Sequence, residues 1–314
     1  MITTLAGGVG AARMLRGLLA AFGDEPQTAV VNTADDDIVN GLNVSPDLDT
    51  VMYTLAGAND DVRGWGLQGE TWLAMESLRR YTSSAGRDDL AWFNLGDRDL
   101  GTHLYRTSRL AEGAALSTVT AEMVAAWGLG LRLLPVTDDR LATRLTTGDG
   151  ELAFQEYFVR EQHGVEVTGV TFAGADTASP APGVLDAIAD ADAVVIAPSN
   201  PIVSIGPLLA VPGVRDALTA RREHTVAISP IIGGKALKGP ADRLLVELGH
   251  ESSAVGVARI YRDLAAVLVI DEEDAALAPA VESVGLRCVV APTIMSRPGV
   301  AESLARAAVD AVRR

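Results

Sequence analysis

Short apolar runs of strand length recur along the chain, and segments with helical spacing of apolar residues lie between many of them. The short runs fall at residues 1–6, 28–33, 131–137, 193–197, 225–229, 265–270 and 286–291. Helices are predicted at residues 14–22, 117–127, 184–191 and 300–312. Because strands that alternate with helices form parallel sheets, the pattern predicts an α/β protein with a Rossmann-like, mostly parallel sheet.

The alternation is interrupted within residues 60–180. This part contains a tryptophan-rich stretch and, further on, two runs at 141–147 and 151–159 that flank Gly148-Asp149-Gly150. A Gly-Asp-Gly sequence between two such runs is typical of a β-hairpin. We therefore expect a single α/β domain over residues 1–314, with a mixed helical and hairpin insertion at about 60–180 that forms an α+β subdomain.

Composition limits the partners of the protein. The chain has 314 residues, of which 48% are hydrophobic, and its net charge is −15, so we expect a large core and no nucleic-acid partner. Residues 193–214 carry no charge, but prolines and glycines interrupt them, so we expect a buried α/β segment and no membrane partner. A single cysteine, Cys288, and no signal-peptide pattern predict a cytoplasmic location.

The first apolar run leads directly into Gly7-Gly8-Val9-Gly10, and a helical segment follows. A strand, a glycine loop and a helix point backbone N–H groups and the positive end of the helix dipole at an anion. Arg13 stands where the dinucleotide fingerprint has its third glycine, and the P-loop sequence Gly-Lys-Ser/Thr is absent. We expect Gly8, Val9, Gly10 and Arg13 to bind phosphate; a glycine turn without a ligand is the alternative.

Two acidic clusters follow the second predicted strand. The first is Asp35-Asp36-Asp37, and the second, Asp47 and Asp49, begins a helix predicted by Ser45-Pro46. Ligands bind open α/β sheets beyond the carboxyl ends of the strands, and Mg²⁺ prefers carboxylate and phosphate oxygens. The clusters therefore predict a Mg²⁺ site formed from Asp35, Asp47 and Asp49. A helix cap at Asp47 and solvated charges in the first cluster are the alternative.

Three of the four tryptophans lie between Trp65 and Trp92, although aromatic residues make up only 4% of the chain. Trp72 and Trp92, with Thr71 and Asn94 beside them, suit a flat aromatic ligand, and core packing is the alternative. His103 follows on a predicted helix. Histidine is the commonest acid–base residue, but a lone helical histidine is more often structural.

Polar side chains also follow the later strands. Ser199, Asn200 and Ser204 lie in a proline-rich loop and offer donors and acceptors for a base or a phosphate. Lys235 is one of only two lysines and follows two glycines. It is a candidate phosphate ligand, or else a solvent-facing lysine in a turn.

Several motifs, in this order, resemble the 2-phospho-L-lactate transferase (CofD/FbiA) family of coenzyme F-420 biosynthesis. The resemblance covers nearly the whole chain. The motifs are Leu5-Ala6-Gly7-Gly8-Val9-Gly10, Asn32 with Asp35-Asp36, Pro46-Asp47-Leu48-Asp49-Thr50, Arg63-Gly64-Trp65-Gly66, Glu70-Thr71-Trp72, Gly96-Asp97-Arg98-Asp99, Pro198-Ser199-Asn200-Pro201 and Ser229-Pro230-Ile231-Ile232.

The resemblance implies a Mg²⁺-dependent transferase that forms homodimers. Such an enzyme moves a phosphoenolpyruvyl or 2-phospholactyl group from a guanosine-diphosphate-linked donor to the ribityl hydroxyl of the deazaflavin FO, giving (dehydro) coenzyme F-420-0 and GMP. The implied roles are metal binding by Asp35 with Asp47 or Asp49, phosphate binding by Gly8, Val9, Gly10 and Arg13, guanosine binding by Ser199, Asn200 and Ser204, and deazaflavin binding by Trp72, Trp92 and Asn94. Asp36 and His103 are the candidates for a general base.

Two other functions compete with this one. A nucleotide-sugar-binding regulator of the same superfamily would lack transferase activity. Such regulators usually carry an Asp-Asp stretch rich in glycine and serine after the second strand. This chain has Asp35-Asp36-Asp37-Ile38-Val39-Asn40-Gly41 there, which favours the transferase. A dinucleotide oxidoreductase is disfavoured by the missing third glycine.

Overall fold

The computed structural model describes residues 1–60 and 62–313. A seven-stranded sheet lies at its centre, and every neighbouring pair of strands in it is parallel. In order across the sheet, the strands are β14 (Arg287–Val290), β13 (Val267–Ile270), β10 (Thr225–Ile228), β9 (Ala193–Ile196), β1 (Ile2–Ala6), β2 (Gln27–Val31) and β5 (Arg132–Pro135). The Rossmann-like α/β fold predicted from the apolar runs is confirmed.

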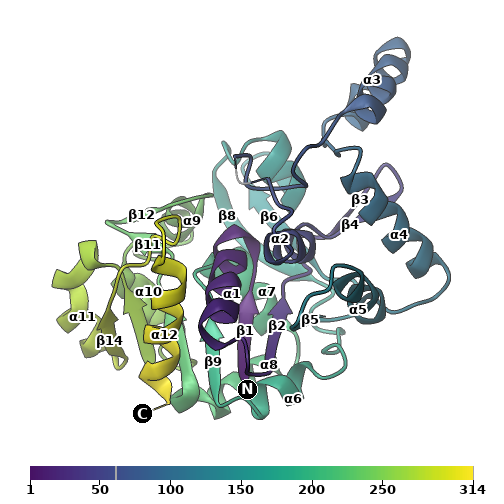
Figure 1. Ribbon diagram of the computed structural model, residues 1–314. Coiled ribbons are helices and arrows are strands. Elements are labelled where there is room, and N and C mark those ends of the chain that lie inside the picture. Colours follow the sequence, from purple (N-terminus) through teal and green to yellow (C-terminus); the bar gives the residue numbers. More distant parts are fainter. Residues whose placement is uncertain (61, 314) are drawn as a thin grey trace.

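Helices cover both faces of this sheet (Figure 1). One face packs against α1 (Gly8–Phe22), α2 (Pro46–Leu55), α5 (Leu116–Ala126) and α12 (Val300–Val312). The other packs against α6 (Val184–Ala189), α7 (Gly206–Ala210), α8 (Val214–Ala220), α9 (Ala241–Glu247), α10 (Ala254–Tyr261) and α11 (Ala278–Val284). The inner strands are buried on both faces, which explains their unbroken apolar sequences.

The order of the strands reverses between β1 and β9. From β1 the chain proceeds to β2 and β5 on one side, and from β9 to β10, β13 and β14 on the other. Ligands bind doubly wound sheets at the carboxyl ends of the strands where such a reversal occurs. Here Gly7–Gly10 follows β1 and Pro198–Ser204 follows β9, so both predicted polar loops border the reversal point.

The predicted insertion at about 60–180 is divided in two, because β5 pairs with β2 and belongs to the central sheet. The first part follows the hairpin of β3 (Asp37–Val39) and β4 (Leu42–Val44) and contains α3 (Leu73–Ala85) and α4 (Asp99–Ala111). The second part is an antiparallel sheet of β6 (Ala142–Thr147), β7 (Gly150–Ala153) and β8 (Val167–Ala173). In Figure 1, α3 projects away from the body of the molecule.

Other details of the insertion also differ from expectation. The hairpin at Gly148-Asp149-Gly150 is confirmed, but the strand predicted at 151–159 ends at Ala153, and a turn of π-helix follows at Glu156–Arg160. A small hairpin of β11 (Ile231–Ile232) and β12 (Lys235–Ala236) follows β10.

In the described part of the chain, no single helix is both long and apolar enough to cross a membrane. The segments Pro201–Ala210 and Val214–Ala220 meet that requirement only when joined, and they are bent by 96° relative to each other.

Two helical glycines allow a test of the packing of α1 against α12. A Cβ added at Gly17 would lie 2.2 Å from the carbonyl oxygen of Ala301, whereas a Cβ at Gly101 would meet no atom within 4 Å. We expect Gly17→Ala to lower the free energy of unfolding by about 2 kcal/mol. Gly101→Ala should leave it unchanged or raise it by up to about 1 kcal/mol. Urea denaturation measures both; equal effects would contradict the packing argument.

Candidate active site

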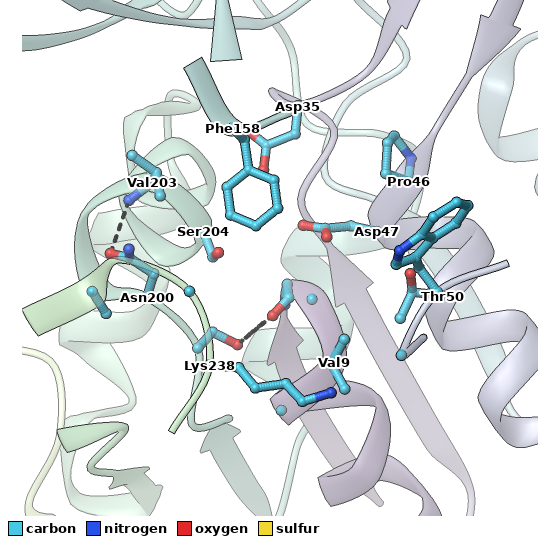
Figure 2. Close-up of a pocket in the computed structure, with 18 of the residues that line it drawn as sticks. Val9, Asp35, Pro46, Asp47, Thr50, Phe158, Asn200, Val203, Ser204 and Lys238 are labelled. Carbon is cyan, nitrogen blue, oxygen red and sulfur yellow. Dashed lines mark hydrogen bonds between the residues drawn. The ribbon is translucent and has the colours of Figure 1, made fainter. Parts of the chain in front are cut away.

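A cavity of about 760 Å³ lies at the reversal point of the sheet. Its lining includes Gly7–Gly10, Asp47 on α2, Pro198–Asn200 after β9, and Pro230 after β10. Both parts of the insertion and the segment after β12 complete its walls. Figure 2 shows that side chains from these separate segments surround a single space. The predicted phosphate, metal and nucleotide segments are therefore brought together.

The glycine loop is held tightly against the loop after β9. The hydroxyl of Ser199 donates to the carbonyl oxygen of Gly7 at 2.8 Å and accepts from the Gly7 N–H at 3.3 Å. A Cβ at Gly10 would lie 2.4 Å from the carbonyl oxygen of Pro198, and one at Gly7 would lie 2.7 Å from the Cβ of Ser204. Only glycine permits this approach, which brings the start of α1 to the edge of the cavity. Gly8, Val9, Gly10 and Arg13 all line it.

Asp35 and Asp47 face the same cavity from different elements (Figure 2). Asp47 accepts from the side-chain amide of Asn32 at 3.0 Å and from the backbone N–H of Gly8. Asp35 accepts from the hydroxyl of Thr143 at 3.2 Å. Within the described residues, neither carboxylate forms an ion pair with a basic side chain.

The pKa of each of these carboxyl groups is raised. Burial raises the pKa of Asp47 to about 6. Burial, and then the nearby charge of Asp47, raises the pKa of Asp35 well above its usual range. Two buried carboxylates without a cation repel each other, and a divalent cation is a ligand that would offset their charge. In the described chain, no three His, Cys, Asp or Glu side chains form a complete metal site, so other ligands would have to come from substrate or water.

Asp49 has a different environment, although it also lines the cavity. Both of its oxygens accept from the guanidinium of Arg106 on α4, with Nη1 at 3.1 Å from Oδ2. Both side chains are buried. Because Asp49 is paired with Arg106, Asp47 is the carboxylate of α2 that could hold a cation together with Asp35.

His103 lines the cavity but is almost completely enclosed in the same network. Its Nδ1 lies 3.4 Å from Nη1 of Arg106, and its Nε2 lies 3.3 Å from Oδ2 of Asp99. Because a guanidinium can only donate, a neutral His103 accepts at Nδ1 and carries its proton on Nε2. Arg106 thus covers Nδ1, while Nε2 is buried beside Asp99 without a hydrogen bond among the described residues.

Asp36 is outside the lining of the large cavity. Its carboxylate accepts from the hydroxyl of Ser45 at 2.6 Å and faces a separate small cavity bordered by Arg140 and Arg144. Burial raises its pKa well above the usual range. Of the two candidate bases, Asp36 lies outside the lining of the large cavity, and His103 is enclosed by Arg106 and Asp99.

The motifs around residues 70 and 97 join the starts of two helices. Glu70 accepts from the backbone N–H groups of Arg98 and Asp99 at 2.8 and 2.9 Å, at the start of α4. In return, Asp97 accepts from the N–H groups of Leu73 and Ala74 at 2.9 and 3.0 Å, at the start of α3, and from the hydroxyl of Thr71. Thr71 therefore lies outside the cavity lining and contributes to a helix cap.

The aromatic residues of the cavity are only partly those expected. Trp72 and Trp92 are outside its lining, where Arg63 stacks on the first and Arg160 on the second. The rings that line it are Trp65, Tyr53, Phe93, Phe154 and Phe158. Asn94 lines it as expected and accepts from Arg79. The tryptophan-rich stretch does contribute to the cavity, through Trp65. The spacing of its residues, however, does not indicate which ring faces inward.

The loop after β9 combines structural and exposed polar groups. Oδ1 of Asn200 accepts from the N–H groups of Ile202 and Val203 at 2.9 and 3.4 Å and caps the following turn. Ser204 lines the cavity beside Gly7. Lys235 lies outside the lining, whereas Lys238, three residues later, is part of it.

The sequence of this chain is similar to those of known proteins. The sequence model described as "2-phospho-L-lactate transferase CofD" matches residues 2–284. The chain belongs to the CofD family. Its relatives include phosphoenolpyruvate transferases of Kitasatospora aureofaciens and Streptomyces griseus. The first is 46% identical, with 98% of this chain and 96% of the relative covered, and the second is 45% identical, with 98% and 97% covered. This CofD family member is thus a transferase enzyme.

The fold of this CofD family member also occurs in a solved structure. A UPF0052 family protein from Bacillus halodurans superimposes with a TM-score of 0.64 at 17% identity, and the alignment covers 98% of both chains. At that identity the likeness concerns the fold alone.

The buried charge of Asp47 should reduce stability at neutral pH. We expect Asp47→Asn to raise the free energy of unfolding by about 1–2 kcal/mol at pH 8. The pKa of Asp47 is about 6 in the folded protein, above its value in the unfolded chain. The ionised carboxylate therefore lowers the free energy of unfolding by its full amount above pH 6, and this loss disappears as the pH falls toward 4. Urea denaturation of both proteins at several pH values measures the difference. A variant less stable than the parent at pH 8 would contradict this account.

Removal of only one partner of the Arg106–Asp49 ion pair should strongly lower the free energy of unfolding. Arg106→Met leaves a buried carboxylate without its partner and should cost about 3–5 kcal/mol of unfolding free energy. The double variant with Asp49→Leu should recover much of that loss, because no unpaired charge remains. As a control, Arg259→Met breaks an exposed pair with Glu251 and should cost under about 0.5 kcal/mol. Equal losses in the single and double variants would refute the coupling.

Proposed function

We propose that this enzyme moves a phosphoenolpyruvyl group from a guanosine-diphosphate-linked donor to the ribityl hydroxyl of the deazaflavin FO, releasing GMP. The observation that carries the proposal is a single cavity that joins the start of α1, the Asp35–Asp47 pair and a set of aromatic rings. The names of the relatives favour phosphoenolpyruvyl over 2-phospholactyl as the transferred group.

Donor binding follows from the loops at the reversal point. Backbone N–H groups at the start of α1 and the guanidinium of Arg13 suit the diphosphate. The side-chain nitrogen of Asn200 and the hydroxyl of Ser204 suit the guanosine. Ser199 contributes indirectly, because its hydroxyl fixes the carbonyl and N–H of Gly7.

Asp35 and Asp47 are proposed to hold Mg²⁺ together with donor phosphate oxygens. Their facing positions and raised pKa values fit a divalent cation. When bound, the ion would neutralise negative charge on the phosphates. Asp49 would support this site indirectly, because its pairing with Arg106 fixes one end of α2 against α4.

Acceptor binding is assigned to the wall formed by the insertion. Trp65, Phe93 and Phe158 line the cavity and offer flat apolar surface for a tricyclic ring. The ribityl hydroxyl would then approach the donor phosphorus above the start of α1. Phosphoryl transfer through a loose transition state depends mainly on the positions of the reacting groups and on charge neutralisation. The proposed reaction therefore does not require His103, which is enclosed by Arg106 and Asp99, to act as a base.

Transfer can be tested directly with FO, the guanosine-diphosphate-linked phosphoenolpyruvyl donor and Mg²⁺. We expect GMP release coupled to the new deazaflavin product, and loss of both when Mg²⁺ is chelated. Asp35→Asn and Asp47→Asn should each lower the rate by about 100-fold or more, while binding of FO, followed by its fluorescence, persists. Chromatography of the products measures the rate.

Asp263→Asn serves as the control, because it removes a carboxylate from an exposed ion pair with Arg262. It should leave the rate unchanged. Tight binding of a nucleotide sugar with no FO binding would reject the transferase proposal in favour of a regulator. Binding of NADH would instead favour an oxidoreductase.

A further inference from the structure

The two lysines of the chain, Lys235 and Lys238, lie close together after β11. Lys235 is in β12, exposed and outside the cavity lining. Lys238 follows β12 and contributes to the lining. Both lysines are exposed, but only Lys238 contributes to the lining of the cavity.

Lys238 lies at the wall of the cavity, after that hairpin. Figure 2 shows its side chain extending toward Val9, at the start of α1. Its Nζ also lies against the loop of the first insertion, where a Cβ at Gly64 would be only 2.7 Å away. Gly64 has φ of +82°, so a glycine both permits this backbone and leaves room for the ammonium. The segment after β12 and the loop at Gly64, which are distant in sequence, therefore meet at Lys238.

The ammonium has no carboxylate partner among the described residues, although the chain carries 41 acidic side chains against 26 basic ones. Arg13, the cation on α1 that lines the same cavity, likewise forms no ion pair there. Arg63 differs, because Asp60 pairs with it at 3.1 Å. Two cations without internal partners thus border the start of α1.

We propose that Lys238 binds the diphosphate of the donor, an inference that rests on the proposed function. An ammonium is a compact charge that binds phosphate without demanding one fixed geometry. In Figure 2 the side chain of Lys238 extends toward the start of α1, where the N–H groups and the helix dipole favour an anion. The diphosphate would then be neutralised by Lys238 and Arg13 on this side and by the Asp35–Asp47 metal site on another.

Calorimetric titration of the full-length protein with GDP and with guanosine, in the presence of Mg²⁺, tests the inference. Lys238→Gln should weaken GDP binding by about tenfold, since one charge-assisted contact is lost. Lys238→Arg keeps the charge and should stay within about threefold of the parent. Guanosine carries no phosphate, so its affinity should be the same in all three proteins. FO binding should also be unchanged.

Lys235→Gln is the matched control, because it removes the same charge from the same hairpin outside the cavity. It should leave the affinity for GDP within about twofold of the parent. If the parent binds GDP and Lys238→Gln binds it equally well, or if GDP and guanosine lose affinity alike, the inference is wrong while the proposed function stands. A parent protein that binds neither GDP nor FO would refute the proposed function itself.

Discussion

Close contact between the loops that follow β1 and β9 is the constraint on which the cavity depends. Both loops leave the sheet where its strand order reverses, and they would diverge if ordinary side chains stood between them. Gly7 and Gly10 remove that obstacle, and the hydroxyl of Ser199 fastens the two backbones together. The start of α1 is therefore presented to the cavity, where Gly8, Val9 and Gly10 all contribute to the lining.

The acidic side chains around this point divide into two kinds. Asp49 has its positive partner within the fold and contributes to rigidity, since Arg106 links α2 to α4. Asp35 and Asp47 have no such partner, so their charges are a cost to the protein without its ligands. Selection for function retains such groups even where a neutral residue would fold better.

The central sheet and the position of the site were predictable from sequence, but the assignment of individual side chains was only partly so. Apolar runs locate all seven strands because strands of a parallel sheet are buried on both faces. The glycine loop and the acidic clusters follow strand ends, so their convergence is a consequence of topology. Whether Lys235 or Lys238 faces the cavity depends on a short irregular hairpin, and the pairing of Asp49 with Arg106 joins residues distant in sequence. No local pattern encodes either contact.

Because β5 divides the insertion, the residues that it contributes to the cavity come from two separate segments of the chain. The glycine loop of the cavity is placed by the central sheet, whereas much of the aromatic wall is carried by segments that leave the sheet after β2 and β5 and return to it. Residues in those segments can be exchanged without moving the ends of β1 and β9. In a scaffold of this kind the aromatic wall can change its shape while the glycine loop and the acidic pair stay in place, so the specificity of the proposed acceptor site can evolve independently of the proposed donor site.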